Sequence, residues 1–110
     1  MSDRIRKVNA LITKEIATII TRNISFKPDV LVTVAKTETV RDLSYATVFI
    51  SVLPESEIHY VMKTLEHEHH VIQKALHKKL VMRTPPKIVF ALDDTARKTD
   101  EMDRLLTDLS

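Results

Sequence analysis

The sequence predicts a single α+β domain with elements in the order α-β-β-α-α-β, followed by a short C-terminal helix or tail. The length sets the first limit, because 110 residues are too few for two cores of ordinary size. Leu, Ile, Val and Phe account for 35 of these residues, which is enough for a buried core and excludes disorder as the main state. Along the chain, apolar spacing changes from helical to alternating and back. We expect the core over about residues 3–94 and the tail over 95–110.

The opening helix is predicted to run from Ser2, a residue type that caps helix N-termini, to about Arg22. Its apolar residues recur at spacings of three and four, the pattern of one buried helix face. They are Ile5, Val8, Leu11, Ile12, Ile16, Ile19 and Ile20. The stretch from Asn23 to Asp29 is polar and contains Pro28, so it is predicted to be a loop.

Three segments have the composition and alternation of strands. The stretch from Val30 to Val40 is rich in Val and Thr, and the stretch from Tyr45 to Leu53 alternates between two sets of residues. Only four residues, 41–44, lie between them, which favours an antiparallel hairpin over a crossover. A third strand is predicted from Lys87 to Asp93, after two prolines that end the preceding helix.

The region between the second and third strands is predicted to be helical. After Pro54, apolar residues recur at Ile58, Val61, Met62 and Leu65, and then the polar run Glu66–His70 interrupts them. The pattern resumes at Val71 and continues to Leu80, so a break between two short helices is expected. Leu65, Ile72 and Leu76 are also in phase for one continuous helix, and the sequence leaves both readings open. A last helix, capped by Asp94 or Thr95, would carry Met102, Leu105, Leu106 and Leu109.

The chain contains neither Cys nor Gly, and the absence of these two residue types excludes whole classes of chemistry. With no Cys, the chain cannot form disulfides, Cys-ligated zinc sites or thiol nucleophiles. With no Gly, it lacks the phosphate loops of P-loop and dinucleotide-binding proteins, and no cofactor is expected. The longest apolar run, Ile88–Leu92, is too short for a signal peptide or a membrane span. We therefore expect a cytoplasmic protein with no membrane partner.

The net charge of the chain is only +2, but the positive and negative charges are concentrated in different segments of the sequence. Residues 1–36 carry +4 and residues 69–87 carry +5, whereas residues 37–68 carry −4 and residues 88–110 carry −3. If the fold brings the two positive segments together, the protein presents a basic face that suits a phosphate backbone. The alternative is that these charges only solvate separate parts of the surface.

The candidate RNA-binding residues come from these two positive segments. They are Lys74, Lys78, Lys79, Arg83, Arg4, Arg6 and Lys7. On a helical wheel, Gln73 and His77 share the solvent-facing arc of Lys74 and Lys78, whereas Lys79 falls in the apolar arc and must extend past its edge. Arg83 could instead interact with the carbonyls at the helix end. Cations are unfavourable at a helix N-terminus, so phosphate contact is one explanation for the cluster at residues 4–7.

Aromatic residues are few, and Phe49 and Phe90 are expected in the core. No aromatic platform for splayed bases is then expected, and recognition of RNA would use the backbone and its shape. His67 and His70 would share a helix face, and Glu66 could add an oxygen ligand, but the spacing matches no metalloprotease signature, so we expect no metal. The adjacent Asp93 and Asp94 would point to opposite faces of a strand, and no catalytic site is expected.

Taken together, the order of elements and several landmarks resemble the ribosome-binding factor A family of bacterial small-subunit assembly factors. The matching residues are Arg4, Val8, Leu11, Ile12, Glu15, Ile16, Val32–Val34, Asp42–Ala46, Val48–Leu53, Leu80, Arg83, Pro86, Ile88, Phe90, Asp93, Leu105 and Leu106. Each piece is a short pattern, and their common order over one domain makes the combination specific.

The resemblance implies a type II KH-like fold with no enzymatic activity. It implies binding to free small (30S) ribosomal subunits and 16S rRNA during late 16S processing and maturation, with a role in cold adaptation. It allows other assembly factors, such as a GTPase, as partners, and we expect a monomer. The family carries an Ala-x-Gly element at the interhelical kink. The corresponding residues here are Glu68, His69 and His70, which keep neither the alanine nor the glycine.

Two other functions are compatible with the residues. The fold could be a protein-interaction module that presents its first or last helix to a partner, without direct RNA binding. A histidine-metal hydrolase is a third hypothesis, and it rests only on the cluster at His67–His70.

Overall fold

The computed structural model describes residues 3–93, and its elements follow the predicted order. They are α1 (Asp3–Asn23), β1 (Leu31–Thr39), β2 (Tyr45–Leu53), the 3-10 turn η1 (Glu55–Glu57), α2 (Ile58–His67), α3 (His69–Lys79) and β3 (Lys87–Leu92). The predicted α+β class and the KH-like order of elements are confirmed. The predicted Ser2 cap and the last helix lie outside the described residues.

Helix α1 forms because its apolar residues lie on one face. Ile12 and Ile16 are completely buried, and Ile19 and Ile20 nearly so. The helix ends at Asn23, whose side-chain amide donates a 2.9 Å hydrogen bond to the Ile19 carbonyl. Within residues 3–93, no helix is both long enough and apolar enough to cross a membrane.

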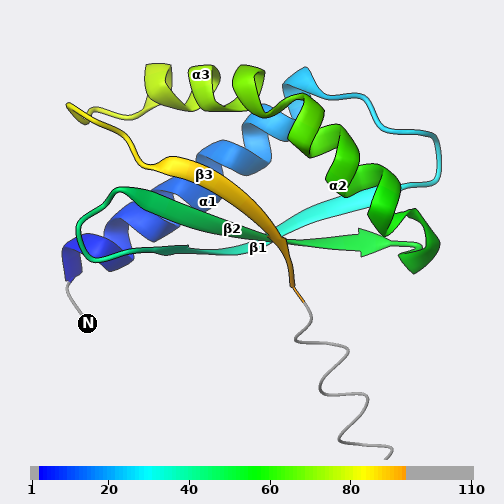
Figure 1. Ribbon diagram of the computed structural model, residues 1–110, viewed down its shortest axis with the longest axis horizontal. Coiled ribbons are helices and arrows are strands. Elements are labelled where there is room, and N and C mark those ends of the chain that lie inside the picture. The colour runs from blue at the N-terminus through cyan, green and yellow to red at the C-terminus, as the bar shows by residue number, and fades with distance from the viewer. Residues whose placement is uncertain (1–2, 94–110) are drawn as a thin grey trace, which may run out of the picture.

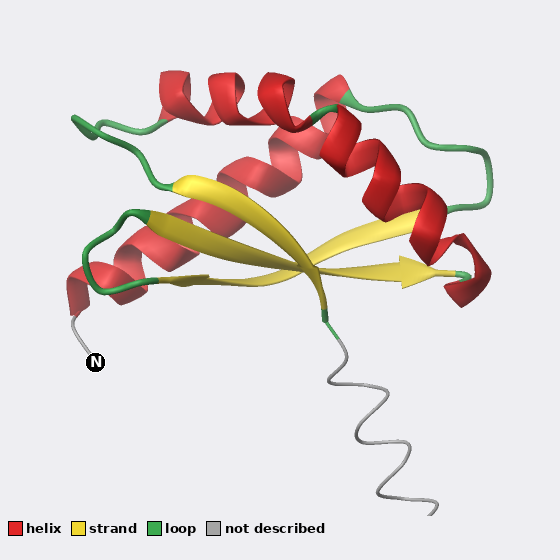
Figure 2. Ribbon diagram, in the orientation of Figure 1, coloured by secondary structure: helices red, strands yellow, loops and turns green. Residues whose placement is uncertain are grey.

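The sheet has the strand order β1-β2-β3, and the helices cover one of its faces (Figure 1). Strands β1 and β2 are antiparallel, as the short segment between them predicts. Strand β3 is parallel to β2, so the chain has to cross from the end of β2 to the start of β3. Figure 2 shows that α2 and α3 make this crossing on the helical side of the sheet.

The middle strand, β2, separates a core face from an open face. Its inward residues Ala46, Val48 and Ile50 are completely buried against the helices. Phe49 points to the opposite face, where the Lys36 ammonium lies 5.0 Å from the centre of its ring. The prediction that Phe49 belongs to the core is therefore wrong, because alternation along a strand places it on the face that no helix covers. Phe90 does pack against the core.

A single residue, Glu68, separates α2 from α3, so the break and not the continuous helix is observed. Backbone hydrogen bonds continue on both sides of it: the Glu68 N–H donates to the Thr64 carbonyl, and the Ile72 N–H donates to the Glu68 carbonyl. The change of direction lets Leu65 and Ile72, one on each helix, both reach the core.

Candidate nucleic-acid interface

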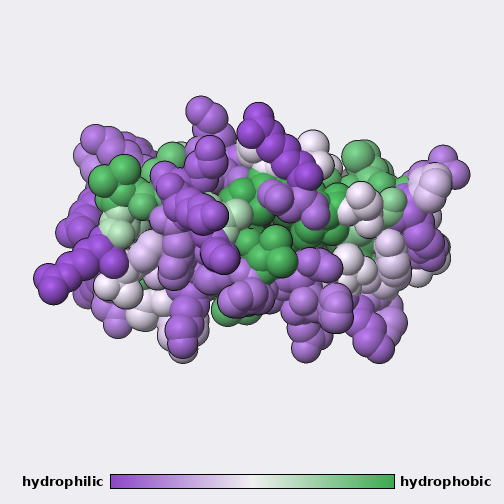
Figure 3. Space-filling model, turned by 90° about the horizontal axis from the view of Figure 1, so that it is seen from above, coloured by the Kyte–Doolittle hydropathy of each residue, from purple (hydrophilic) through white to green (hydrophobic). Residues whose placement is uncertain are grey.

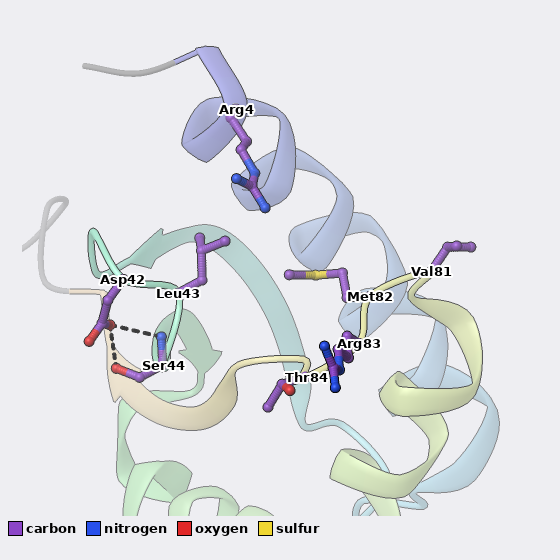
Figure 4. Close-up of a pocket in the computed structure, with 8 residues that line it drawn as sticks. All are labelled: Arg4, Asp42, Leu43, Ser44, Val81, Met82, Arg83 and Thr84. Atoms are coloured by element: carbon purple, nitrogen blue, oxygen red, sulfur yellow. Dashed lines mark hydrogen bonds between the residues drawn. The ribbon is translucent and has the colours of Figure 1, made fainter.

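Three segments that are distant in the sequence meet at one end of the molecule (Figure 1). They are the start of α1, the turn between β1 and β2, and the loop between α3 and β3. A cavity of about 510 Å³ opens among them (Figure 4). It is lined by Arg4, Asp42, Leu43, Ser44, Val81, Met82, Arg83 and Thr84. The two positive segments of the sequence therefore meet here through Arg4 and Arg83.

The cations at the start of α1 are not equivalent. Arg4 lines the cavity and is exposed. Arg6 instead forms an ion pair with Asp3 at 2.8 Å, in which both side chains are about three-quarters exposed. Lys7 is exposed and lies outside the cavity lining. Of the three predicted α1 residues, Arg4 alone lines the same cavity as Arg83.

The loop that carries Arg83 is fixed at both ends. At its start, Leu80 is buried and its N–H donates to the Leu76 carbonyl at 3.0 Å, which ends α3. At its end, Pro86 is buried and its carbonyl accepts a 2.9 Å hydrogen bond from Gln73. Between these anchors Arg83 and Thr84 are exposed, so the loop presents them to solvent from a defined position.

The turn between β1 and β2 contributes a carboxylate to the cavity. Asp42 Oδ1 accepts hydrogen bonds from the Ser44 hydroxyl at 2.5 Å and the Ser44 N–H at 3.0 Å. These bonds hold the pKa of Asp42 below its usual value, because they stabilise the charged form. Between Asp42 and Ser44, Leu43 adopts a left-handed backbone conformation with φ of 64°. The cavity thus combines two guanidinium groups with one ionised carboxylate.

The predicted lysines of α3 extend this charge beyond the cavity. Lys74, Lys78 and Lys79 are all exposed, and Lys78 and Lys79 form the last turn of α3, just before the loop of Arg83. Within residues 3–93, none of these lysines is in an ion pair, and α3 contains no acidic residue. Seen from the helical side, hydrophilic side chains cover most of the surface, and apolar ones form a band along the middle (Figure 3). We use the term basic end for Arg4, Lys78, Lys79 and Arg83.

The junction of α2 and α3 lies at the opposite end of α3 from the basic end. Helix α3 has eleven residues, so about 15 Å of helix separates them. Glu66 and His70 are exposed at the junction, whereas His69 is half-buried and its Nε2 contacts the Ile88 carbonyl at 2.6 Å. The fold therefore separates Glu68, His69 and His70 from the basic end, whereas the predicted cation Lys74 lies one helical turn after His70 on α3. Among residues 3–93, no group of three His, Asp or Glu side chains could hold a metal ion.

Gln73 does not belong to the solvent-facing arc in which the helical wheel placed it. Its Oε1 accepts from the Ile88 N–H at 2.8 Å, and its Nε2 donates to the Pro86 carbonyl. The wheel fails here because β3 passes along this side of α3, a relationship that the helix itself does not encode. Sequence reasoning also missed Asp42, Ser44 and Thr84, since only the three-dimensional meeting of the turn and the loop identifies them.

Comparison with known proteins identifies the family. The family model for ribosome-binding factor A matches residues 4–106. This chain belongs to the ribosome-binding factor A family. Ribosome-binding factor A of Akkermansia muciniphila is 36% identical over 109 residues, which cover 99% of this chain and 86% of that protein.

Solved structures of ribosome-binding factor A share the fold. The crystal structure from Thermus thermophilus superimposes with a TM-score of 0.69 at 20% identity, over 80% of this chain and 93% of that one. A homology model of the Thermus thermophilus factor, fitted into a cryo-electron microscopy map of its complex with the 30S subunit, gives a TM-score of 0.66 at 22% identity. The match covers 77% of this chain and 90% of that one. The predicted resemblance to ribosome-binding factor A is confirmed.

Proposed function

We propose that this protein binds the small (30S) ribosomal subunit and contacts 16S rRNA with its basic end. The observation that carries the proposal is the meeting of Arg4 and Arg83, one from each positive segment, at a single cavity. Membership of a family of ribosome-binding factors supports it, as does the fold shared with a relative that was fitted into a 30S complex.

Association of this kind relies on charge and shape. Guanidinium groups match phosphate oxygens with paired hydrogen bonds, and each neutralised phosphate releases counterions into solution. The lysines of α3 add charge without fixed geometry, which suits a phosphate backbone whose path varies. Under this proposal the protein acts by binding and not by catalysis. It leaves the subunit when the recognised rRNA site matures.

Co-sedimentation with purified small subunits tests the proposal. We expect the affinity to fall steeply as salt rises, because phosphate contacts dominate. Replacing Lys78 and Lys79 of the basic end, together with Lys74 one helical turn before Lys78, by Ala should weaken association about tenfold or more and leave the fold intact. The matched control replaces Lys14, Arg22 and Lys63, three exposed cations away from the basic end, and should change association much less.

Two outcomes would contradict the RNA-based proposal. One is a binding curve that does not respond to salt, and the other is equal association by the two triple variants. RNase treatment addresses the protein-interaction alternative directly. Association that survives removal of accessible RNA would indicate that a ribosomal protein is the partner.

The proposal extends to the cellular role that the family resemblance implies. The protein would act as a cytoplasmic monomer on free small subunits in late 16S rRNA processing, with greater importance in the cold and alongside other assembly factors such as a GTPase. A strain lacking the protein should accumulate 16S precursor, more so at low temperature. In gradients the protein should travel with free small subunits and be absent from polysomes.

A further inference from the structure

A second cavity lies beside the one lined by Arg4 and Arg83. It has a volume of about 430 Å³ and is formed by the β1–β2 turn, the start of β3 and one side of α3. The two cavities share Leu43, Ser44 and Thr84 in their walls. They are therefore adjacent compartments of one site, and a ligand that spans Thr84 can enter both.

The lining of the second cavity differs chemically from that of the first. Tyr45 and Pro85 provide flat apolar surface, and Tyr45 remains 48% exposed although it begins the middle strand. Lys87, the β3 residue paired with Tyr45 in the sheet, adds one exposed cation. The volume lies in the range of small-ligand sites. An aromatic surface next to a cationic groove is the combination with which proteins hold single-stranded nucleic acid.

The polar groups of this cavity have defined roles. Gln73 is held in place by its hydrogen bonds with the Pro86 carbonyl and the Ile88 N–H. Its Nε2 atom also lies 3.0 Å from His77 Nε2. Gln73 and His77 therefore place polar nitrogen atoms in the wall of this cavity.

We propose that the two cavities together bind one unstacked nucleotide of RNA. The base occupies the Tyr45 cavity, where it stacks on the ring, and the adjoining phosphate lies between Arg4 and Arg83. This proposal rests on the proposed RNA-binding function and gives it a base-dependent component. The sequence alone predicts no platform for splayed bases, because the place of Tyr45 in this cavity depends on how the turn, α3 and β3 meet.

Two short RNAs that differ only in one base test this site. One is a pentaribonucleotide with a single central adenine and abasic riboses elsewhere, and the other is fully abasic, so both carry the same phosphates. Binding to the ¹⁵N-labelled full chain is measured by NMR titration. We expect the base-bearing RNA to bind about tenfold more tightly, the effect typical of one stacked base. The amide signals of Tyr45 and Thr84 should shift with the base-bearing RNA.

Variants then separate the two compartments. Tyr45→Ala should remove the preference for the base and leave the affinity for abasic RNA unchanged, whereas Tyr45→Phe should keep the preference. Arg83→Ala should weaken both RNAs equally. Val89→Ala serves as the control, because Val89 is also about half exposed but lies outside the cavity lining, and it should change neither affinity.

The inference is overturned if the wild-type chain binds both RNAs equally or if Tyr45→Ala keeps the preference. If the wild-type chain binds both RNAs with equal, salt-dependent affinity and also associates with small subunits, the proposed function is supported and the base site is not. A base preference without subunit association would support the site and contradict the proposed function. Absence of binding to either RNA would overturn the nucleotide site, and subunit co-sedimentation would then decide the proposed function separately.

Discussion

The Gln73 side chain takes the place of a neighbouring strand at the edge of β3, accepting from the Ile88 N–H at 2.8 Å and donating to the Pro86 carbonyl at 2.9 Å. Gln73→Leu would leave both half-buried backbone groups without these partners. We expect the variant to lose about 1–3 kcal/mol of unfolding free energy, measured by urea denaturation. Lys74→Ala, an exposed change on the same helix, should cost less than about 0.5 kcal/mol. Equal stability of the two variants would contradict this role for Gln73.

Ile50 should be among the positions most sensitive to truncation. It is completely buried at the centre of β2, between the other two strands and beneath the helices. Ile50→Ala should lower the unfolding free energy by about 2–5 kcal/mol, since it removes buried methyl groups and leaves a cavity. Val89→Ala, on the open face, should cost clearly less. A loss below about 1 kcal/mol for Ile50→Ala would show that the core rearranges to fill the space.

Asn9 joins α1 to β1 through one side-chain oxygen. Its Oδ1 accepts from the Thr39 hydroxyl at 2.5 Å and from the Thr39 N–H at 3.0 Å. Asn9→Ala should destabilise the fold by about 1–3 kcal/mol, because both donors lose their partner. Hydrogen exchange at the Thr39 amide should also become faster. Unchanged exchange in the variant would contradict the contribution of this bond.

Asp42 should make stability depend on acid pH. Hydrogen bonds from Ser44 lower its pKa in the folded state from the ordinary value of 3.8, so ionised Asp42 favours folding. This contribution is fully present above that ordinary value and is lost as the pH falls through the lower, folded-state pKa. Asp42→Asn should therefore show a smaller loss of stability than the wild type between about pH 4 and pH 2. Identical pH profiles in thermal unfolding would rule out this linkage.

The charge of Asp42 should also limit RNA affinity. Its carboxylate shares the cavity with Arg4 and Arg83 and would repel a phosphate placed there. Asn can still accept the hydrogen bonds from Ser44, so Asp42→Asn removes charge while preserving the turn. We expect affinity for the fully abasic pentaribonucleotide to rise roughly two- to fivefold at low salt, and less at high salt. No increase at low salt would mean that the phosphate binds elsewhere.

Local patterns were sufficient to predict the order of elements. The spacing of isoleucines marks α1, and alternation from Tyr45 to Leu53 gives the bounds of β2 as observed. Alternation alone could not say which face the helices cover, because Phe49 and Leu53 make the second face apolar as well. The prediction therefore placed Phe49 in the core.

The site was predictable only in part. Arg4 and Arg83 were selected from the charge of their own segments, but their meeting depends on the path of the whole chain. Asp42 lines the cavity of Arg4 and Arg83, and Tyr45 lines the adjacent one, because of the turn between β1 and β2, in which Leu43 has a left-handed backbone. Gly and Asn are the residues that usually adopt this conformation. Because this position is Leu, the sequence gives no local indication of the left-handed turn.

The contacts of α3 with β3 also affect how the protein behaves at high concentration. A sheet ends in strands whose outward N–H and C=O groups can recruit a strand from another molecule, which is a route to aggregation. At the start of β3, Gln73 bonds to the Ile88 N–H and to the carbonyl of Pro86, the residue before the strand, and His69 contacts the Ile88 carbonyl. At the other edge, an irregularity between Val34 and Lys36 interrupts the register of β1. The start of β3 and the irregular part of β1 are thereby poorer templates for intermolecular strand addition.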